Sequence, residues 1–249
     1  MTHILTDVMG VVVDPVRYQN ESIYLMESDG SRFLFDVLNI RETEENKGPL
    51  QKVKDFKNQL MERYQTETLS VSVACFVEQM RQGALAEDDP LNKGFSYLMW
   101  HLGRDRGFPH GKLHGCFYPD VSPAFDSFKA KGAQISVYSD MYPGDGHKYI
   151  REVFRTGLRL QFPVELNPII ASFYDTQEVG PAVDAQSYRN LADRLQTTPG
   201  ELLYLSNKPN QLDAAAEAGC RVVLVDRINI MAAETRYQRI SSFSEVNEL

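Results

Sequence analysis

Three polar segments, far apart along the chain, contain the residues best suited to chemistry. Each directly follows a short apolar run, and they are Asp7, the pair Ser139-Asp140 and the pair Ser206-Asn207. An aspartate carboxylate can attack an electrophilic centre, while hydroxyl and amide groups can hold an anionic group. Taken one at a time, such residues commonly cap a helix or close a turn. Their joint occurrence after three apolar runs predicts one shared site.

The elements that would position these residues alternate between strand and helix in the second half of the chain. Expected strands lie at 3–7, 134–139, 202–206 and 222–226, and expected helices at 122–131, 187–195 and 212–218. Such alternation is typical of a parallel sheet covered by helices, so the fold class is α/β with a Rossmann-like sheet. Ligands of open parallel sheets bind outside the carboxyl ends of the strands. The polar residues above fall at those ends.

The segment between the first strand and residue 108 has a different pattern. Apolar residues recur at three- and four-residue steps between 49 and 103, which indicates helices. Residues 22–38 contain two apolar runs around Asp29-Gly30, which favours a hairpin, with a helix as the competing interpretation.

Four segments resemble the haloacid dehalogenase superfamily, and in particular the enolase-phosphatase of methionine salvage. They are residues 4–10, 117–139, 179–192 and 202–219. The resemblance implies a haloacid dehalogenase-like core domain formed by residues 1–14 and 108–249. It also implies a mostly helical cap domain at 15–107, inserted after the first strand.

The resemblance assigns roles to residues at the four motifs, and several motifs are degenerate. Asp7 matches the nucleophile, and Ser139 matches a hydroxyl that holds the transferred group. Met9 stands where many phosphatases of the family have a general acid. Ala182 stands in place of the family lysine, and Asn207 in place of the aspartate that helps to bind Mg²⁺. Three chemical groups are therefore lost.

The expected site follows from these matches. Asp7 is the catalytic candidate, and Asp7 with Asn207 would form a metal site that is weak or absent, so no cofactor is expected beyond weakly bound Mg²⁺. The candidates for contacting a ligand are Ser139, Asp140, Ser206, Asn207 and Lys208. Lys208 either brings a cation near the site or is a solvated surface charge.

Three functions remain open. The first is a non-catalytic or strongly altered member that binds a small anionic molecule or a protein partner. The second is a metal-free hydrolase using Asp7, because the dehalogenase branch also has a Ser-Asn pair at the fourth motif, although it keeps the lysine that Ala182 replaces. The third is a weak Mg²⁺-dependent phosphatase acting on an enol or sugar phosphate.

Composition limits the partners and the location. The chain has 34 acidic and 26 basic residues and a formal net charge of −8, which disfavours nucleic acid as a partner. It contains no run of 18 apolar residues and no signal-peptide pattern, so a membrane partner is not expected. Its three cysteines form no close pair, which is typical of reduced thiols in a cytoplasmic protein.

Overall fold

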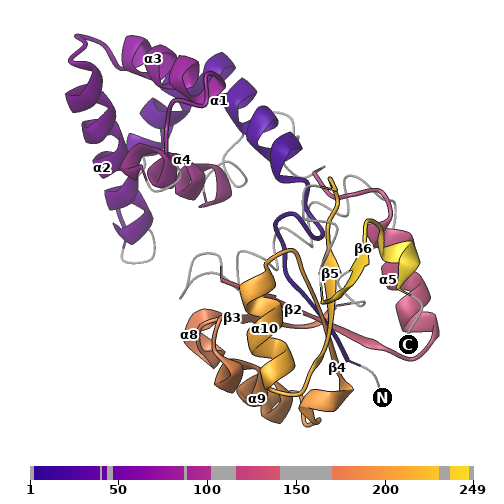
Figure 1. Ribbon diagram of the computed structural model, residues 1–249. Coiled ribbons are helices and arrows are strands. Elements are labelled where there is room, and N and C mark those ends of the chain that lie inside the picture. The colour runs from indigo at the N-terminus through magenta and orange to yellow at the C-terminus, as the bar shows by residue number, and fades with distance from the viewer. Residues whose placement is uncertain are drawn as a thin grey trace. The chain divides into compact units, whose positions relative to one another are not determined.

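The computed structural model divides the chain into two compact units (Figure 1). It describes residues 3–39, 41–43, 47–86, 89–101, 116–140, 170–229 and 236–246. The core unit comprises Met1–Pro15 and His114–Leu249, and the helical unit comprises Val16–Leu113. The sequence analysis placed these boundaries after residues 14 and 107, and the second of them lies outside the described residues.

The core unit contains a six-stranded sheet in which all pairings are parallel. Its strands are β1 (His3–Thr6), β2 (Gln134–Ser139), β3 (Ile170–Asp175), β4 (Leu202–Ser206), β5 (Arg221–Val225) and β6 (Gln238–Ile240). The strand order is β3-β2-β1-β4-β5-β6. The predicted α/β fold with a Rossmann-like parallel sheet is therefore confirmed.

The strand order places the carboxyl ends of β1, β2 and β4 next to one another. In the register of the sheet, Thr6 pairs with Val137 on one side and with Leu205 on the other. Along the chain, β2 and β3 extend the sheet on one side of β1, and β4 to β6 extend it on the other. The order reverses beside β1, and this reversal is where parallel sheets of this kind form a ligand crevice.

Helices cover both faces of the sheet (Figure 1). The helical segments of the core unit are α5 (Val121–Ala130), α8 (Thr176–Val179), α9 (Ala185–Arg194), η3 (Pro199–Glu201), α10 (Pro209–Glu217) and η4 (Phe243–Glu245). Three fully buried tyrosines, Tyr138, Tyr188 and Tyr204, lie between the sheet and the pair α9 and α10. Buried strand faces of this kind explain why the core strands read as nearly continuous apolar runs in the sequence.

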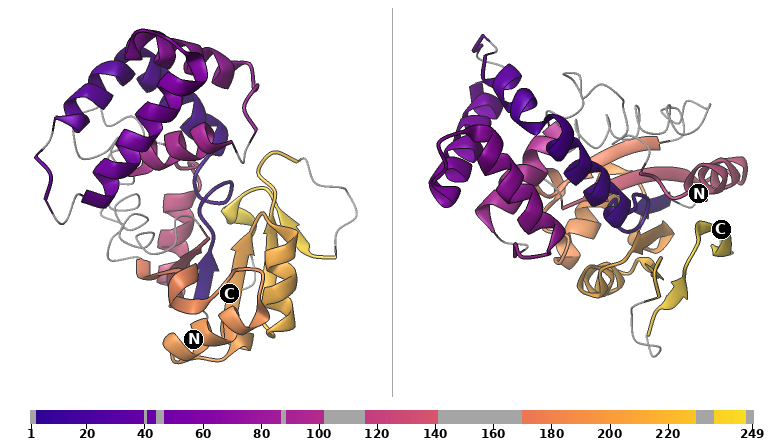
Figure 2. Two further views of the ribbon diagram at one scale, coloured as in Figure 1. Left: turned by 90° about the vertical axis from the view of Figure 1, so that its left-hand side faces the viewer. Right: turned by 90° about the horizontal axis from the view of Figure 1, so that it is seen from above.

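The helical unit consists, in its described part, of four helices (Figure 2). They are α1 (Pro15–Leu38), α2 (Lys47–Tyr64), α3 (Leu69–Arg81) and α4 (Pro90–His101). Phe76 of α3 joins three of them, because its ring lies 5.7 Å from that of Phe56 in α2 and 5.3 Å from that of Phe95 in α4. The helical interpretation of residues 49–103 is confirmed where these residues are described.

The favoured hairpin at residues 22–38 is wrong, because this segment lies within α1. Ile23, Met26, Gly30 and Leu34 are buried and recur at helical spacing. Gly30 is needed for packing rather than for a turn, because a Cβ atom there would come within 2.6 Å of the Met26 sulfur. The competing helical interpretation is the correct one.

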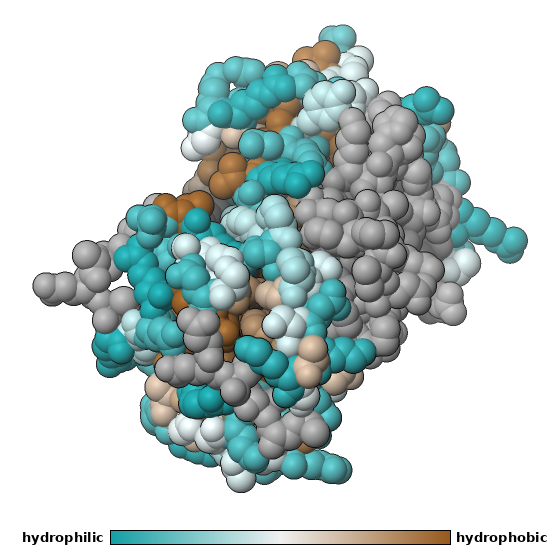
Figure 3. Space-filling model, turned by 90° about the vertical axis from the view of Figure 1, so that its right-hand side faces the viewer, coloured by the Kyte–Doolittle hydropathy of each residue, from teal (hydrophilic) through white to brown (hydrophobic). Residues whose placement is uncertain are grey.

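The described surface is mainly hydrophilic on the face drawn in Figure 3, with apolar side chains scattered over it. None of the helices in the described ranges is long and apolar enough to cross a membrane.

Candidate functional site

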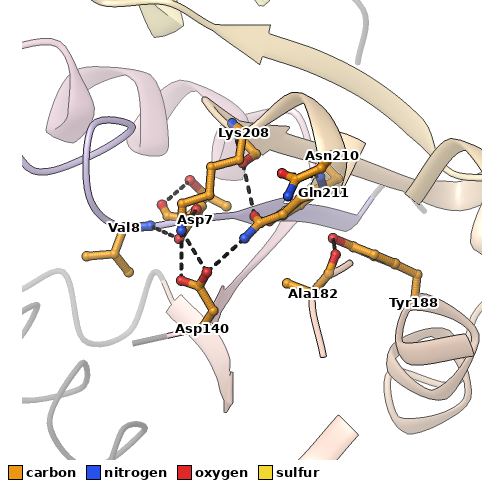
Figure 4. Close-up of polar contacts among 11 residues, drawn as sticks. Asp7, Val8, Asp140, Ala182, Tyr188, Lys208, Asn210 and Gln211 are labelled. Carbon is orange, nitrogen blue, oxygen red and sulfur yellow. Dashed lines mark hydrogen bonds and ion pairs between the residues drawn. The ribbon is translucent and has the colours of Figure 1, made fainter. Parts of the chain in front are cut away.

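Asp7 lies at the carboxyl end of the central strand β1, and the backbone fixes its carboxylate. Its backbone N–H continues the sheet with a 3.0 Å bond to the carbonyl of Leu205. Its side chain is only 2% exposed, and Oδ1 accepts a 2.7 Å hydrogen bond from the backbone N–H of Val8 (Figure 4). The carboxylate is thus held in one orientation at the point where the sheet order reverses.

Burial dominates the electrostatics of Asp7. Removal from water raises the pKa of its carboxyl group to about 6, and the negative charge of Asp140 acts in the same direction. The positive charge of Lys208 and the hydrogen bond from Val8 lower the pKa and offset only part of this effect. Asp7 is therefore mainly ionised at neutral pH but takes up a proton in mildly acidic solution.

Lys208 places a cation directly beside Asp7. Its Nζ atom lies 3.5 Å from Asp7 Oδ2 and 2.8 Å from both carboxylate oxygens of Asp140 (Figure 4). Burial alone would lower the pKa of Lys208, but the two carboxylates outweigh it and the net shift is upward. Lys208 is consequently charged at neutral pH, and it binds the ends of β1 and β2 together.

Gln211 is a member of the site that the sequence analysis missed. Its Nε2 atom donates a 3.0 Å hydrogen bond to Asp140 Oδ2. Its Oε1 atom accepts hydrogen bonds from Tyr204 Oη at 2.7 Å and from Ser206 Oγ at 3.2 Å. The only sequence signal was Pro209, which suits the first position of a helix and thereby places residues 208 and 211 one turn apart.

Of the five predicted ligand-contacting residues, three are linked to one another by hydrogen bonds. The other two, Ser139 and Asn207, have different neighbours. Asp140 and Lys208 contact each other, and Ser206 supports them through Gln211 and through a 3.1 Å bond that its Oγ atom accepts from the backbone N–H of Lys208. Ser139 is buried at the end of β2, beside Asp175 of β3 in the register of the sheet.

Asn207 lies against Gly10, which belongs to the loop that follows Asp7. Gly10 has a φ angle of +75°, and a Cβ atom there would come within 2.3 Å of Asn207 Nδ2. Only glycine fits this position, both because of the left-handed backbone and because of the close side chain. Met9, at the position of the family acid, is half-buried and offers only a thioether, which has no proton to donate.

Ala182 is part of the apolar core and carries no group that could reach a ligand. It is 5% exposed, and its carbonyl accepts a 2.8 Å hydrogen bond from Tyr188 Oη (Figure 4). The neighbouring carbonyls of Val179, Gly180 and Pro181 also accept hydrogen bonds from side chains. This segment is fixed by the core, so the positive charge beside Asp7 comes from Lys208 and not from here.

Arg227 holds the loop that follows Asp7, a role that the sequence did not reveal. Its Nε and Nη2 atoms donate hydrogen bonds of 3.0 and 2.8 Å to the carbonyl of Val11. The Arg227 side chain is 4% exposed, and its Nη1 atom forms a 2.6 Å ion pair with Asp120. The guanidinium carbon lies 4.4 Å from the centroid of the Tyr118 ring and 4.6 Å from that of Phe243. Arg227 therefore ties the loop that follows Asp7 to the segments that contain Asp120 and Phe243.

The side chains present do not fit a tightly bound Mg²⁺ ion. Asp7 offers a carboxylate, and Asn207 offers a neutral amide oxygen, Oδ1, that is buried without a hydrogen-bond partner among the described residues. No group of three or more His, Cys, Asp or Glu side chains in the described part could hold a metal ion. A divalent ion at Asp7 would also be repelled by the ammonium group of Lys208, 3.5 Å from Asp7 Oδ2.

Proteins similar to this chain include enolase-phosphatases and a yeast protein of known structure. No protein-family model matches the chain. An enolase-phosphatase E1 from Streptomyces avermitilis is 36% identical over 130 residues, which cover 52% of this chain and 49% of the relative. An enolase-phosphatase E1 from Klebsiella pneumoniae subsp. pneumoniae is 30% identical over 167 residues, covering 66% and 67%. The crystal structure of the UTR4 protein from Saccharomyces cerevisiae has a TM-score of 0.61 at 21% identity, covering 98% of both chains.

The chain spans about half to two thirds of the length of the curated relatives it matches. Solved structures of haloacid dehalogenase superfamily hydrolases share its fold at lower sequence identity. The sequence relatives, the parallel sheet and the position of Asp7 all agree with the resemblance found in the motifs. The chain is therefore a member of the haloacid dehalogenase superfamily that resembles enolase-phosphatase E1.

Proposed function

We propose that this protein binds a small anion at Lys208 and does not hydrolyse phosphate esters at the rate of an enzyme. One observation supports this most directly: Lys208, the cation that the described site offers, is shared by the carboxylates of Asp7 and Asp140. A phosphatase must instead concentrate positive charge around the group that it transfers.

The net charge of the site also disfavours a phosphate ester. With Asp7 and Asp140 ionised and Lys208 protonated, the three side chains carry −1 − 1 + 1 = −1. A phosphate ester dianion would bring two more negative charges into this environment. The half-buried Met9 provides no acid for the leaving oxygen, and the buried Ala182 provides no second cation. Loss of a general acid alone costs roughly 10²–10⁴ in rate.

One specific observation favours a second candidate, a metal-free hydrolase. The absence of a lysine at Ala182 counted against such chemistry in the sequence, yet Lys208 Nζ lies 3.5 Å from Asp7 Oδ2. In this alternative, the Asp7 carboxylate bonds to a carbon or phosphorus centre as the bond to the leaving group breaks, and Lys208 stabilises the charge that develops. Water then cleaves the aspartyl intermediate, which releases the product and a proton and regenerates the Asp7 carboxylate. A weak Mg²⁺-dependent phosphatase is a poorer candidate, because the donor set does not fit a tightly bound metal ion.

The test combines turnover with binding. We expect only background hydrolysis of p-nitrophenyl phosphate and of a 2-haloacid, with Mg²⁺ or with a chelator, and we expect Asp7→Asn to change nothing. Calorimetry should detect binding of a small anion, and Lys208→Met should abolish it. Turnover that persists in chelator and is lost in Asp7→Asn would establish the metal-free hydrolase. Turnover that requires both Mg²⁺ and Asp7 would establish a phosphatase.

We further propose a cytoplasmic protein whose ligand is a small molecule rather than nucleic acid or membrane. The net charge of −8 supports the exclusion of nucleic acid. Cys75, Cys116 and Cys220 form no disulfide in the described part of the chain, and two of these thiols are buried, which supports a reducing compartment.

A further inference from the structure

We infer that Lys208 and Gln211 form a binding site for a carboxylate group, and that the protein's own Asp140 occupies this site when no ligand is bound. The inference rests on the proposed anion-binding function and names the chemical class of the ligand.

The contacts of Asp140 define what the site accepts. Lys208 Nζ lies 2.8 Å from each of its two carboxylate oxygens, and Gln211 Nε2 lies 3.0 Å from Oδ2 (Figure 4). A single ammonium group in contact with both oxygens, together with an amide donor on one of them, matches a planar carboxylate. A small carboxylate that replaced Asp140 would form the same three hydrogen bonds.

Gln211 is held so that it offers a donor to the ligand. Its side chain is 2% exposed, and its Oε1 atom receives the hydroxyl groups of Tyr204 and Ser206. Ser206 Oγ accepts a bond from the backbone N–H of Lys208, so its own proton is available for Gln211. The amide oxygen therefore bonds to Tyr204 and Ser206, and the amide nitrogen points at Asp140. This donor is in place before a ligand arrives, which lowers the entropy cost of binding.

Of the two carboxylates beside Lys208, Asp140 is the one that can leave. Its side chain is 36% exposed, whereas that of Asp7 is 2% exposed and bonded to Val8. An exposed carboxylate that turns away regains its hydration at once, while a buried one cannot. Lys208 is itself 37% exposed, so a ligand can reach its ammonium group from the solvent.

The local charge selects a carboxylate over phosphate. A monocarboxylate that displaces Asp140 leaves the number of negative charges on Lys208 unchanged. A phosphate dianion adds one further negative charge close to the buried Asp7 carboxylate. In a partly buried site this added repulsion is weakly screened, and it disfavours the dianion.

Removal of the internal competitor is the decisive experiment. Isothermal titration at constant ionic strength would compare acetate with inorganic phosphate on the full chain and on Asp140→Ala. If Asp140 occupies the site for about nine-tenths of the time, Asp140→Ala strengthens acetate binding about tenfold. The milder Asp140→Asn should also strengthen it, while Lys208→Met should abolish it and Gln211→Leu should weaken it. The matched control is Asp126→Ala, which removes an exposed carboxylate of α5.

The outcomes separate the two proposals. If neither anion binds any of these variants, the proposed anion-binding function is wrong. If anions bind but phosphate binds as tightly as acetate, or Asp140→Ala and Asp140→Asn bind acetate no better than the unmodified chain, the carboxylate site is wrong and anion binding stands. Near-ultraviolet circular dichroism of Tyr138, Tyr188 and Tyr204 reports whether each variant keeps its folded core.

Discussion

Replacement of Asp7 by asparagine should stabilise the protein at neutral pH, because the folded structure buries this carboxylate at a cost. Burial raises the pKa of Asp7 from 3.8 to about 6. The folded state therefore binds the Asp7 proton more tightly than the unfolded chain does. Stability from this group is present below pH 3.8 and is lost as the pH rises through about 6. Asparagine is neutral at every pH, so a variant with asparagine at this position does not lose this stability as the pH rises.

The size of the effect follows from the same shift. A difference of about 2 pKa units corresponds to about 3 kcal/mol once both states are ionised. Linkage makes the penalty at pH 5 about half of the roughly 3 kcal/mol that applies at pH 8. The advantage of Asp7→Asn should thus grow by about 1–2 kcal/mol between these two pH values. Asparagine keeps an oxygen for the backbone N–H of Val8, and Lys208 keeps Asp140 as its partner.

Urea unfolding at pH 5 and pH 8, followed by the near-ultraviolet signal of the core tyrosines, measures this difference. Urea is uncharged and leaves the screening of charges unaltered. Asp126→Asn on α5 is the control, because it removes an exposed carboxylate from the same unit. If Asp7→Asn has the same midpoint as the unmodified chain at pH 8, or if its advantage does not depend on pH, the reasoning about burial is refuted.

Three further predictions concern the surroundings of this carboxylate. Asn207→Asp should convert weak Mg²⁺ binding into binding that calorimetry detects at millimolar ion, because it restores a charged ligand; tight binding by the unmodified chain would contradict this. Gly10→Ala should destabilise the chain by at least about 1 kcal/mol in urea unfolding, because alanine meets both a φ of +75° and the Asn207 amide 2.3 Å from its Cβ; an unchanged midpoint would contradict the packing. Arg227→Met should cost about 1–3 kcal/mol in urea unfolding, because the carbonyl of Val11 loses the donors it has from Arg227 and Asp120 keeps, in the described part of the chain, only its hydrogen bonds from Ser242 and Phe243; an unchanged midpoint would show that the ion pair is dispensable.

Much of the core unit could be predicted from the sequence, because its strands are buried on both faces. The segments that became β1, β2, β4 and β5 are short, nearly continuous apolar runs that end in polar residues. Such runs leave few alternatives once helices alternate with them. The motifs then indicated which strand ends would come together, and Asp7 follows the central strand.

The features that the sequence predicted wrongly or left open depend on tertiary packing, which local sequence patterns do not indicate. Asp29-Gly30 has the composition of a hairpin turn, but Gly30 lies within α1, at a position where a larger residue would collide with Met26. The positions of Lys208 and Gln211 depend on where α10 begins and on how its first turn faces β2. That geometry is tertiary, so the sequence could leave Lys208 only as a choice between a site cation and a solvated charge.

The hydrogen bonds of Arg227 to Val11 also determine when the loop that follows Asp7 can reach its final conformation during synthesis. Arg227 and Val11 are 216 residues apart, so the loop around Val11 leaves the ribosome long before the residue that secures it has been synthesised. The helical unit is one continuous segment between the two parts of the core unit. It can therefore fold before β2 and β4, the strands that pair with β1, have been synthesised. A chain released before Arg227 is made would lack the bonds that hold the loop after Asp7, so translation itself delays the formation of an intact site until Arg227 has been added.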